Sequence, residues 1–278
     1  MTVIGAVLGF PISHSLSPAL YRAAFTELGI QGDYVAMECH ADNVAEMFQQ
    51  VRQQNFRALS ITMPLKEEII PLLDGIDSNA DLLDAVNCVS FIDGVAVGHN
   101  TDGDGCCDAL EEQGGASLQG ARVVLIGAGG TARSVALALG RRGAHISVMN
   151  RSLDNALYLV GRLSEDIEAH GGSITLGGVA DVENASVLIN TTSVGMNSSE
   201  TPLSPEYLHS DLVVLDAVYQ PMTTTLLADA ARAGATTVDG LWMLIQQARR
   251  QCVHQFGQKP SVGVLRAAAE RELSHRHK

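Results

Sequence analysis

Residues 122–132 have the sequence RVVLIGAGGTA, and this stretch decides the fold of the central part of the chain. The run 122–126 is rich in Val, Leu and Ile, which predicts a strand buried on both faces. Gly127, Gly129 and Ala132 then match the pattern G-x-G-x-x-[G/A] at the start of a predicted helix. Gly127 allows a tight turn and Gly129 lets the backbone approach a pyrophosphate, so the stretch indicates a dinucleotide site at a helix start. A glycine turn without a ligand is the alternative.

Strands alternate with helical patterns on both sides of this stretch. The strands predicted after it are 146–149, 187–189 and 212–216. The strands predicted before it are 3–8, 34–37 and 58–62. Ser17 and Asp42 are expected to cap helices between the early strands, and Asp93-Gly94 predicts a hairpin over 86–98. The fold class is therefore α/β, with a mostly parallel sheet in the first domain and a doubly wound, Rossmann-like second domain.

The end of the strand after the glycine turn bears on the choice of cofactor. An NAD site usually has Asp or Glu there, which bonds the ribose hydroxyls. This chain has Asn150, Arg151 and Ser152 instead. Because an acid is absent and an arginine is present, a 2′-phosphate is better accommodated, and we expect NADP, with NAD possible. A solvated surface charge is the alternative for Arg151.

Composition excludes several classes of function. The chain has 278 residues, of which 46% are hydrophobic and 18% charged, enough for two domains with large cores. The net charge of −13 argues against a nucleic-acid partner, because phosphate backbones need a basic field. No apolar run reaches membrane-spanning length, so we expect no membrane partner either.

Cysteine usage and the start of the chain indicate a compartment. Five cysteines without a C-x-x-C pattern predict neither a disulfide framework nor a metal site, and they fit a reducing environment. The apolar start lacks a basic region, so we expect no signal peptide and a cytoplasmic protein. The expected partner is a small-molecule substrate, and the expected state is a monomer or homodimer.

Three further polar motifs surround the glycine turn. They are His14-Ser15-Leu16-Ser17-Pro18, Ile61-Thr62-Met63-Pro64-Leu65-Lys66 and Gly98-His99-Asn100-Thr101-Asp102-Gly103. Together with the glycine turn they resemble the shikimate dehydrogenase family, over a span from Val3 to about Ala248. The resemblance implies a substrate domain over 1–103, completed by returning C-terminal helices over 239–278, and a dinucleotide-binding domain over 104–238.

The resemblance implies a reaction and a catalytic pair. The reaction is the NADP-dependent, reversible reduction of 3-dehydroshikimate to shikimate, on the route to chorismate and the aromatic amino acids. Reducing a ketone leaves negative charge on its oxygen, which a nearby ammonium stabilises and protonates. In the family, the lysine of T-x-P-x-K and the aspartate of N-T-D-G fill these roles, which implies Lys66 and Asp102 here. Taken alone, Lys66 followed by Glu67 and Glu68 would sooner indicate a surface lysine that begins a helix, and the other motifs favour the catalytic role.

The resemblance also implies the remaining site residues. Several short polar side chains suit a small ring that carries hydroxyls and a carboxylate. The implied substrate-binding residues are Ser15, Ser17, Thr62, Asn87, Tyr219 and Gln247. The implied cofactor-binding residues are Gly127, Ala128, Gly129, Gly130, Thr131, Asn150, Arg151, Ser152, Thr192, Ala217 and Gly240. No metal is expected, because these positions contain no cluster of metal ligands.

Four positions depart from the family pattern and keep alternatives open. They are Asp84 and Cys88 beside the A-V-N motif, Trp242 in place of a glycine, and Asn155 in place of a second basic residue. A relative that acts on quinate or an aminoshikimate, with NAD as a possible cofactor, is one alternative. A non-catalytic dinucleotide-binding sensor is a second, which retention of Lys66 and Asp102 disfavours. A dehydrogenase of the methylene-folate kind is a third, and its site would not need the serine motif and Asn100-Thr101-Asp102 together.

Overall fold

The computed structural model describes residues 2–276 and divides the chain into two compact units. Unit 1 contains the residues up to Thr101 and those from Gln247 onward, and unit 2 contains Asp102–Gln246. The chain therefore leaves unit 1 once and returns to it through its C-terminal helices. The expected functional domains are a substrate domain over 1–103 with 239–278 and a dinucleotide-binding domain over 104–238. This assignment of roles stays a prediction.

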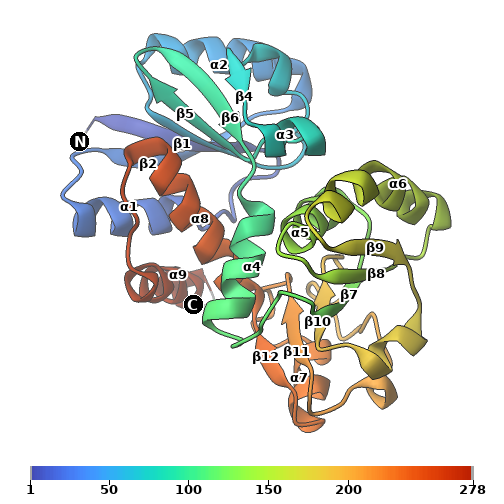
Figure 1. Ribbon diagram of the computed structural model, residues 1–278. Coiled ribbons are helices and arrows are strands. Elements are labelled where there is room, and N and C mark those ends of the chain that lie inside the picture. Colours follow the sequence, from blue (N-terminus) through green and yellow to red (C-terminus); the bar gives the residue numbers. More distant parts are fainter. Residues whose placement is uncertain (1, 277–278) are drawn as a thin grey trace. The chain divides into compact units, whose positions relative to one another are not determined.

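A mixed six-stranded sheet forms the centre of unit 1 (Figure 1), with the order β2-β1-β3-β5-β6-β4. Its strands are β1 (Val3–Gly9), β2 (Asp33–Glu38), β3 (Ala58–Ile61), β4 (Gly75–Ile76), β5 (Cys88–Ile92) and β6 (Val95–His99). The first three are parallel, and β5 runs antiparallel to both β3 and β6. The sequence predicted every strand except β4, which has only two residues.

Three residues with positive φ lie in the turns of this part of unit 1. Asp93 and Gly94 have φ values of 51° and 82°, which confirms the predicted hairpin turn between β5 and β6. Asp84 has φ 51° at the end of α3 (Ser78–Leu83). A helix end of this kind usually has glycine, and aspartate is among the few other residues that tolerate it. This geometry explains how aspartate can stand where the family usually has glycine.

The predicted cap of the first helix is wrong. Helix α1 (Ser17–Leu28) includes Ser17 as its first residue, and Leu16 occupies the N-cap position. The Ser15 hydroxyl accepts a hydrogen bond from the Ser17 N–H at 3.2 Å. Ser15 therefore satisfies one of the free N–H groups at the helix start, which releases Ser17 from that task. Gly29 ends the helix in the left-handed conformation, as predicted.

The second predicted cap is also wrong. Helix α2 (Val44–Gln53) follows Asn43, whose side chain accepts from the His40 N–H at 2.8 Å, and Asp42 lies inside the preceding 3₁₀ turn.

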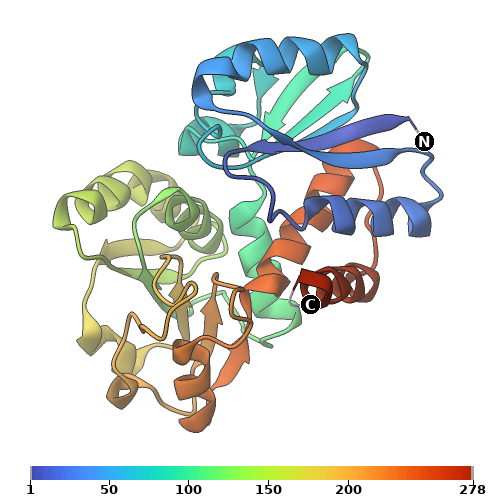
Figure 2. The ribbon, with the colours of Figure 1, turned by 180° about the vertical axis from the view of Figure 1, so that it is seen from behind.

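Helix α9 (Val262–Arg276) packs beside α1, as both Figure 1 and Figure 2 show. Both helices belong to unit 1, so the C-terminal return completes this unit.

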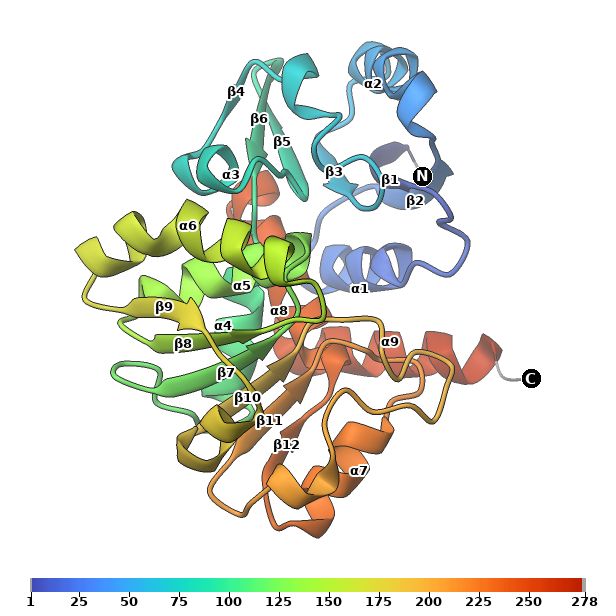
Figure 3. The ribbon, with the colours of Figure 1, turned by 90° about the vertical axis from the view of Figure 1, so that its right-hand side faces the viewer.

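Unit 2 contains a fully parallel sheet with the order β12-β11-β10-β7-β8-β9, visible as successive arrows in Figure 3. The strands are β7 (Arg122–Ile126), β8 (His145–Met149), β9 (Ser173–Leu176), β10 (Val187–Asn190), β11 (Val213–Asp216) and β12 (Thr236–Val238). The order reverses between β7 and β10, and such a reversal is where open α/β sheets bind ligands. The edge strands β9 and β12 were not predicted.

The helices of unit 2 come before, between and after its strands in the sequence. They are α4 (Asp102–Glu112), α5 (Gly130–Gly140), α6 (Leu153–Ala169), α7 (Thr225–Arg232) and the first turns of α8 (Gly240–Phe256). Helix α4 packs closely on α5 because Gly103 has no side chain. The Gly103 N–H donates to the Ser134 hydroxyl at 2.9 Å, and a Cβ at Gly103 would lie 2.0 Å from the Ser134 carbonyl oxygen.

All five cysteines are buried and unpaired. They are Cys39, Cys88, Cys106, Cys107 and Cys252. Burial raises the pKa of Cys106 and of Cys252 to about 12. These thiols therefore stay protonated at neutral pH, which makes them poor nucleophiles.

Within residues 2–276, the helices lack the length and apolar character needed to cross a membrane.

Candidate functional site

The glycine turn in unit 2 has the geometry of a phosphate site. Gly127 follows β7 with φ 117°, and a Cβ there would lie 2.5 Å from the Thr191 hydroxyl. Gly129 occupies the N-cap of α5, and a Cβ there would meet no described atom within 4 Å. A ligand can therefore approach the backbone at Gly129–Thr131 closely, where the free N–H groups and the helix dipole favour an anion. The residues present fit the phosphates of a dinucleotide.

The turn after β8 holds Arg151 at the surface. The Asn150 side chain donates to the Ser152 carbonyl at 2.8 Å. The Ser152 hydroxyl caps α6 by accepting from the Asn155 N–H at 3.4 Å. Asn150 and Ser152 thus shape the turn, and Arg151 between them is exposed. An exposed guanidinium next to the strand that follows the glycine turn suits a 2′-phosphate.

Asn190, at the end of β10, anchors the loop that contains Thr192. Its side chain is fully buried, and its Oδ1 accepts from the Thr192 hydroxyl at 2.7 Å and from the Thr192 N–H at 3.0 Å. Its Nδ2 donates to Asp216 at 2.9 Å and to the Val194 carbonyl at 3.2 Å. Asn190 therefore joins the carboxyl ends of two neighbouring strands.

The segment after β11 includes the predicted residues Ala217 and Tyr219. The Ala217 N–H donates to the Asn190 carbonyl at 2.8 Å, and Tyr219 is half-buried. Gly240, at the start of α8, is buried against this segment, and a Cβ there would lie 2.4 Å from the Ala217 carbonyl oxygen. Gly240 thus permits close packing behind Ala217, and its predicted contact with a cofactor stays a prediction.

Asp216 gives a pH-dependent test of this anchor. Its carboxylate accepts from Thr224 at 2.6 Å, from Asn190 at 2.9 Å and from the Val218 N–H at 3.1 Å. Burial nevertheless raises its pKa, and the three hydrogen bonds only partly offset that effect. The folded state therefore holds this proton more tightly than the unfolded state, so the stability linked to Asp216 is present at low pH and is lost as pH rises through the folded pKa.

We expect the wild-type protein to gain stability relative to Asp216→Asn as the pH is lowered from 7 toward 4.5. Asparagine has no proton to titrate there, so the variant removes the linkage. Urea unfolding of both proteins at the two pH values measures the difference in unfolding free energy. A difference that grows in the opposite direction contradicts the raised pKa.

In unit 1, the strand and loop that contain Thr62 and Lys66 are fixed by backbone hydrogen bonds. The Thr62 N–H donates to the Leu8 carbonyl at 2.9 Å, and the Val86 N–H donates to the Lys66 carbonyl at 2.8 Å. Lys66 belongs to unit 1, whereas Asp102 is the first residue of α4 in unit 2. The catalytic pairing of Lys66 with Asp102 therefore stays a prediction.

Three predicted or neighbouring polar residues of unit 1 form one buried cluster. Asn87 is 2% exposed, and its Oδ1 accepts from the Thr101 N–H at 2.8 Å. Its Nδ2 lies 3.1 Å from the Thr101 hydroxyl and 3.4 Å from Gln247 Oε1. The structure thus brings together Asn87 and Gln247, which are 160 residues apart, and Thr101 of the N-T-D-G motif bonds to the Asn87 side chain and to the Gln247 carbonyl.

The serine motif is held by the last helix of unit 1. Arg276 donates to the His14 carbonyl at 2.7 Å and to the Ser15 carbonyl at 3.0 Å. Ser15 is half-buried, and Ser17 is 8% exposed. The loop is thus fixed through its backbone, while the hydroxyl of Ser15 accepts from the Ser17 N–H at the start of α1. Arg276 lies outside the sequence motifs that predicted the site.

One arrangement in unit 1 resembles a serine-hydrolase triad. His99 Nε2 lies 3.1 Å from the Ser90 hydroxyl, and His99 Nδ1 lies 2.9 Å from Asp77 Oδ2. Ser90, however, is only 1% exposed, so a substrate cannot reach its hydroxyl. The His254 ring stacks on His99 with the centroids 4.0 Å apart. The arrangement therefore fixes the end of β6, just before Asn100-Thr101-Asp102.

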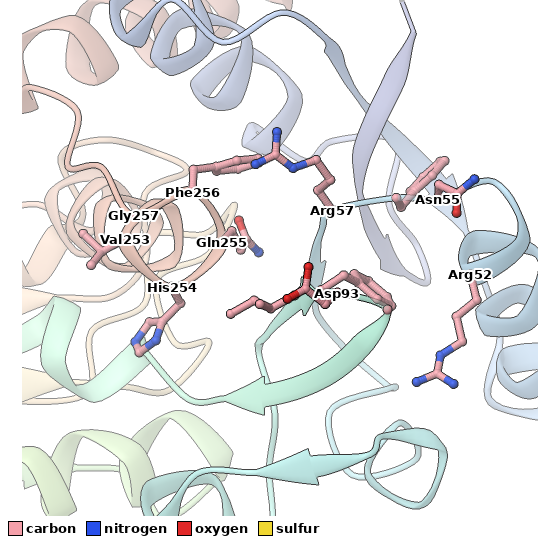
Figure 4. Close-up of a pocket in the computed structure, with 13 residues that line it drawn as sticks. Arg52, Asn55, Arg57, Asp93, Val253, His254, Gln255, Phe256 and Gly257 are labelled. Carbon is pink, nitrogen blue, oxygen red and sulfur yellow. The ribbon is translucent and has the colours of Figure 1, made fainter.

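A surface depression of about 690 Å³ also lies in unit 1 (Figure 4). It borders the C-terminal end of α8 and the hairpin turn at Asp93, and Arg57 lies over the Phe256 ring. Among the described residues, those that line it include none of the predicted site positions. We therefore do not place the reaction there.

Among residues 2–276, no group of three or more His, Cys, Asp or Glu side chains could hold a metal ion.

Two family models match the sequence. The model of the shikimate dehydrogenase substrate binding domain matches residues 7–89, which lie in unit 1. The model of shikimate / quinate 5-dehydrogenase matches residues 109–194, which lie in unit 2. The first match includes Lys66 and Asn87, and the second includes the glycine turn and Arg151.

Known proteins are similar over almost the whole chain. A shikimate dehydrogenase (NADP(+)) of Thermococcus kodakarensis is 39% identical over 274 residues, which cover 98% of each chain. The crystal structure of a shikimate dehydrogenase in complex with NADP⁺ has a TM-score of 0.91 at 33% identity and covers 98% of this chain and 96% of that one. A shikimate 5-dehydrogenase from Thermus thermophilus in complex with NADP(H) and shikimate has a TM-score of 0.88 at 33% identity, with 98% and 100% covered.

Proposed function

Because the chain belongs to the shikimate dehydrogenase family, as its motifs predicted, we propose that it reversibly reduces 3-dehydroshikimate to shikimate with NADP. The observation that carries this proposal is the glycine turn of unit 2, where a Cβ at Gly129 would enter open space and α5 begins at Gly130. The exposed Arg151 after β8 adds the charge that a 2′-phosphate needs. The NADP(+)-dependent relative from Thermococcus kodakarensis supports the same cofactor.

The mechanism assigns roles to residues of both units. Bound NADPH supplies a hydride equivalent to the ketone carbon. Lys66 stabilises the negative charge that develops on the ketone oxygen and donates the proton that completes the alcohol. Asp102 orients the Lys66 ammonium and takes part in returning its proton. The ketone carbon gains the hydride and its oxygen gains the proton, which together give the alcohol.

The remaining residues position the substrate. Asn87 and Gln247 are expected to hold ring hydroxyls, because their buried amides are fixed by neighbours in unit 1. Ser15 and Ser17 are expected to bind the carboxylate near the start of α1, where the helix dipole favours an anion. Five buried, unpaired thiols support work in a reducing compartment such as the cytoplasm.

The function is tested by following nicotinamide absorbance with purified protein, shikimate and either NADP or NAD. Shikimate-dependent reduction of NADP supports the proposal. Turnover with NADP and quinate or an aminoshikimate, but not with shikimate, would replace the substrate and keep the reaction type. A protein that binds NADP and turns over none of these would be the non-catalytic sensor.

Arg151→Gln is expected to raise KM for NADP by about ten- to a hundredfold, because a charged hydrogen bond contributes about 1.5–3 kcal/mol. KM for NAD should stay within about twofold, because NAD has no 2′-phosphate for Arg151 to bind. Arg162→Gln on α6 is the matched control, since it removes the same charge from the same unit. Equal changes in KM for both cofactors would contradict the role of Arg151.

A further inference from the structure

Three glutamines follow one another along α8 at a spacing of four residues. Gln247, Gln251 and Gln255 are 8%, 2% and 5% exposed, and we call them the glutamine ladder. Residues four apart lie on one face of a helix, so the ladder places three amides in a row within unit 1. Burying an amide costs free energy unless its hydrogen bonds are made. The hydrogen-bond partners of each of these glutamines therefore indicate what its side chain does.

Gln251, the middle residue of the glutamine ladder, uses the full hydrogen-bonding capacity of its amide. Its Nε2 donates to the Asn87 carbonyl at 3.1 Å and to Gln247 Oε1 at 2.7 Å. Its Oε1 lies 2.6 Å from the Ser60 hydroxyl and 2.9 Å from the Tyr21 hydroxyl. A glutamine amide has two N–H donors and two acceptor lone pairs, so this environment specifies one orientation of the side chain. Gln251 touches both residues that are expected to hold the substrate ring.

The direction of donation along this network follows from its chemistry. An amide oxygen only accepts, so the Ser60 hydroxyl donates to Gln251 Oε1. The Tyr34 hydroxyl, 2.8 Å from Ser60 Oγ, must then donate to Ser60. Burial raises the pKa of Tyr34, so its phenol keeps the proton that this bond requires. The donors therefore run one way, from Tyr34 through Ser60 and Gln251 to Gln247.

This direction determines what Gln247 can offer a ligand. Its Oε1 accepts from Gln251 at 2.7 Å and faces Asn87 Nδ2 at 3.4 Å. Two donors from within unit 1 thus engage the oxygen. The other polar atom of that amide is Nε2, which can only donate. Any ligand atom that Gln247 recognises through this amide nitrogen must therefore be an acceptor.

We propose that Gln251 is a positioning residue that fixes Gln247 as a hydrogen-bond donor and thereby selects an oxygen acceptor on the substrate. The proposal rests on the proposed function and adds a specificity to it. A hydroxyl or carbonyl oxygen satisfies the fixed N–H. An ammonium group at the same place of the ring sets a second donor against this N–H, so no hydrogen bond forms between the two groups and the ammonium is disfavoured.

Gln251→Met tests the proposal, because methionine fills similar space and removes both polar groups. We expect KM for shikimate to rise about tenfold, the equivalent of about 1.4 kcal/mol, while KM for NADP stays within about twofold. Gln255→Met is the matched control. Gln255 is equally buried one turn further along, and its bonds go to the Leu59 and Val89 carbonyls and Tyr21. This control should lose comparable thermal stability and keep KM for shikimate within about twofold.

The double variant with Gln247→Ala separates positioning from a general loss of packing. Once Gln247 is removed, Gln251→Met should raise KM for shikimate by less than about twofold further, because the two residues act as one unit. Equal rises in both KM values, no rise in Gln251→Met, or independent effects in the double variant would each overturn the positioning role while the function stands. A wild-type protein without shikimate turnover would overturn the proposed function, and this inference with it.

Discussion

Lys66→Met should lower kcat for shikimate-dependent NADP reduction by about a thousandfold, within the range of a hundred- to ten-thousandfold typical of a lost general acid. Methionine keeps an apolar stem of similar length and removes the ammonium that is expected to stabilise and protonate the ketone oxygen. Steady-state kinetics with saturating NADP and shikimate measure the loss. KM for NADP should change little, since the proposed phosphate contacts of the cofactor are the glycine turn and Arg151 and do not include Lys66.

The chain supplies a matched control for this variant. Lys259 is an exposed lysine in the same unit, and Lys259→Met removes the same charge from the protein. It should leave kcat unchanged. Thermal unfolding of both variants tests whether the fold is intact. If Lys66→Met keeps the wild-type rate, Lys66 is not the proton donor and the enzymatic mechanism proposed here is wrong.

The largest effect on stability is expected from Gly103→Ala. In an exposed helix interior this substitution stabilises by about 1 kcal/mol, because alanine favours helix. At Gly103 the new Cβ would lie 2.0 Å from the Ser134 carbonyl oxygen of α5, so two helix backbones must separate. We expect a loss of about 3 kcal/mol, the upper part of the range for overpacked sites. Denaturant unfolding with the wild type alongside measures it.

Gly161→Ala is the comparison that isolates the steric cause. Gly161 lies inside α6 of the same unit, and a Cβ there would meet no described atom within 4 Å. That variant should gain about 0.5–1 kcal/mol, the ordinary advantage of alanine over glycine. A Gly103→Ala protein as stable as the wild type would mean that α4 and α5 can move apart without cost.

Local signals in the sequence predicted much of the fold. The hairpin at Asp93-Gly94 and the turn at Gly127 require positive φ, and the residue types at these positions predicted this backbone conformation. The missed strands β9 and β12 lie at the edges of their sheet and are mostly exposed, so they carry no hydrophobic pattern. The wrong cap at Ser17 has a different cause. Serine is a favoured cap residue at either position 15 or 17, so the residue types do not show where the helix begins. The path of the chain places Leu16 at the N-cap and leaves the Ser15 hydroxyl to accept from the Ser17 N–H.

The site was predicted less completely, because its supporting contacts join distant parts of the chain. The spacing of Gln247, Gln251 and Gln255 is visible in the sequence, but the Ser60 hydroxyl that orients Gln251 lies 191 residues away. The bond between Asn190 and Asp216 likewise depends on the order of strands in the sheet, not on any local pattern. A buried polar residue has no signature until its partner is known.

The placement of the cysteines gives the protein an internal set of chemical labels. Cys39, Cys88 and Cys252 lie in unit 1, and Cys106 and Cys107 lie in unit 2. Because burial keeps all five from solvent, a thiol reagent applied in a short pulse modifies a cysteine only while its surroundings are open. Peptide mapping after such a pulse would therefore follow the opening of each unit separately, in the natural sequence and without an introduced probe.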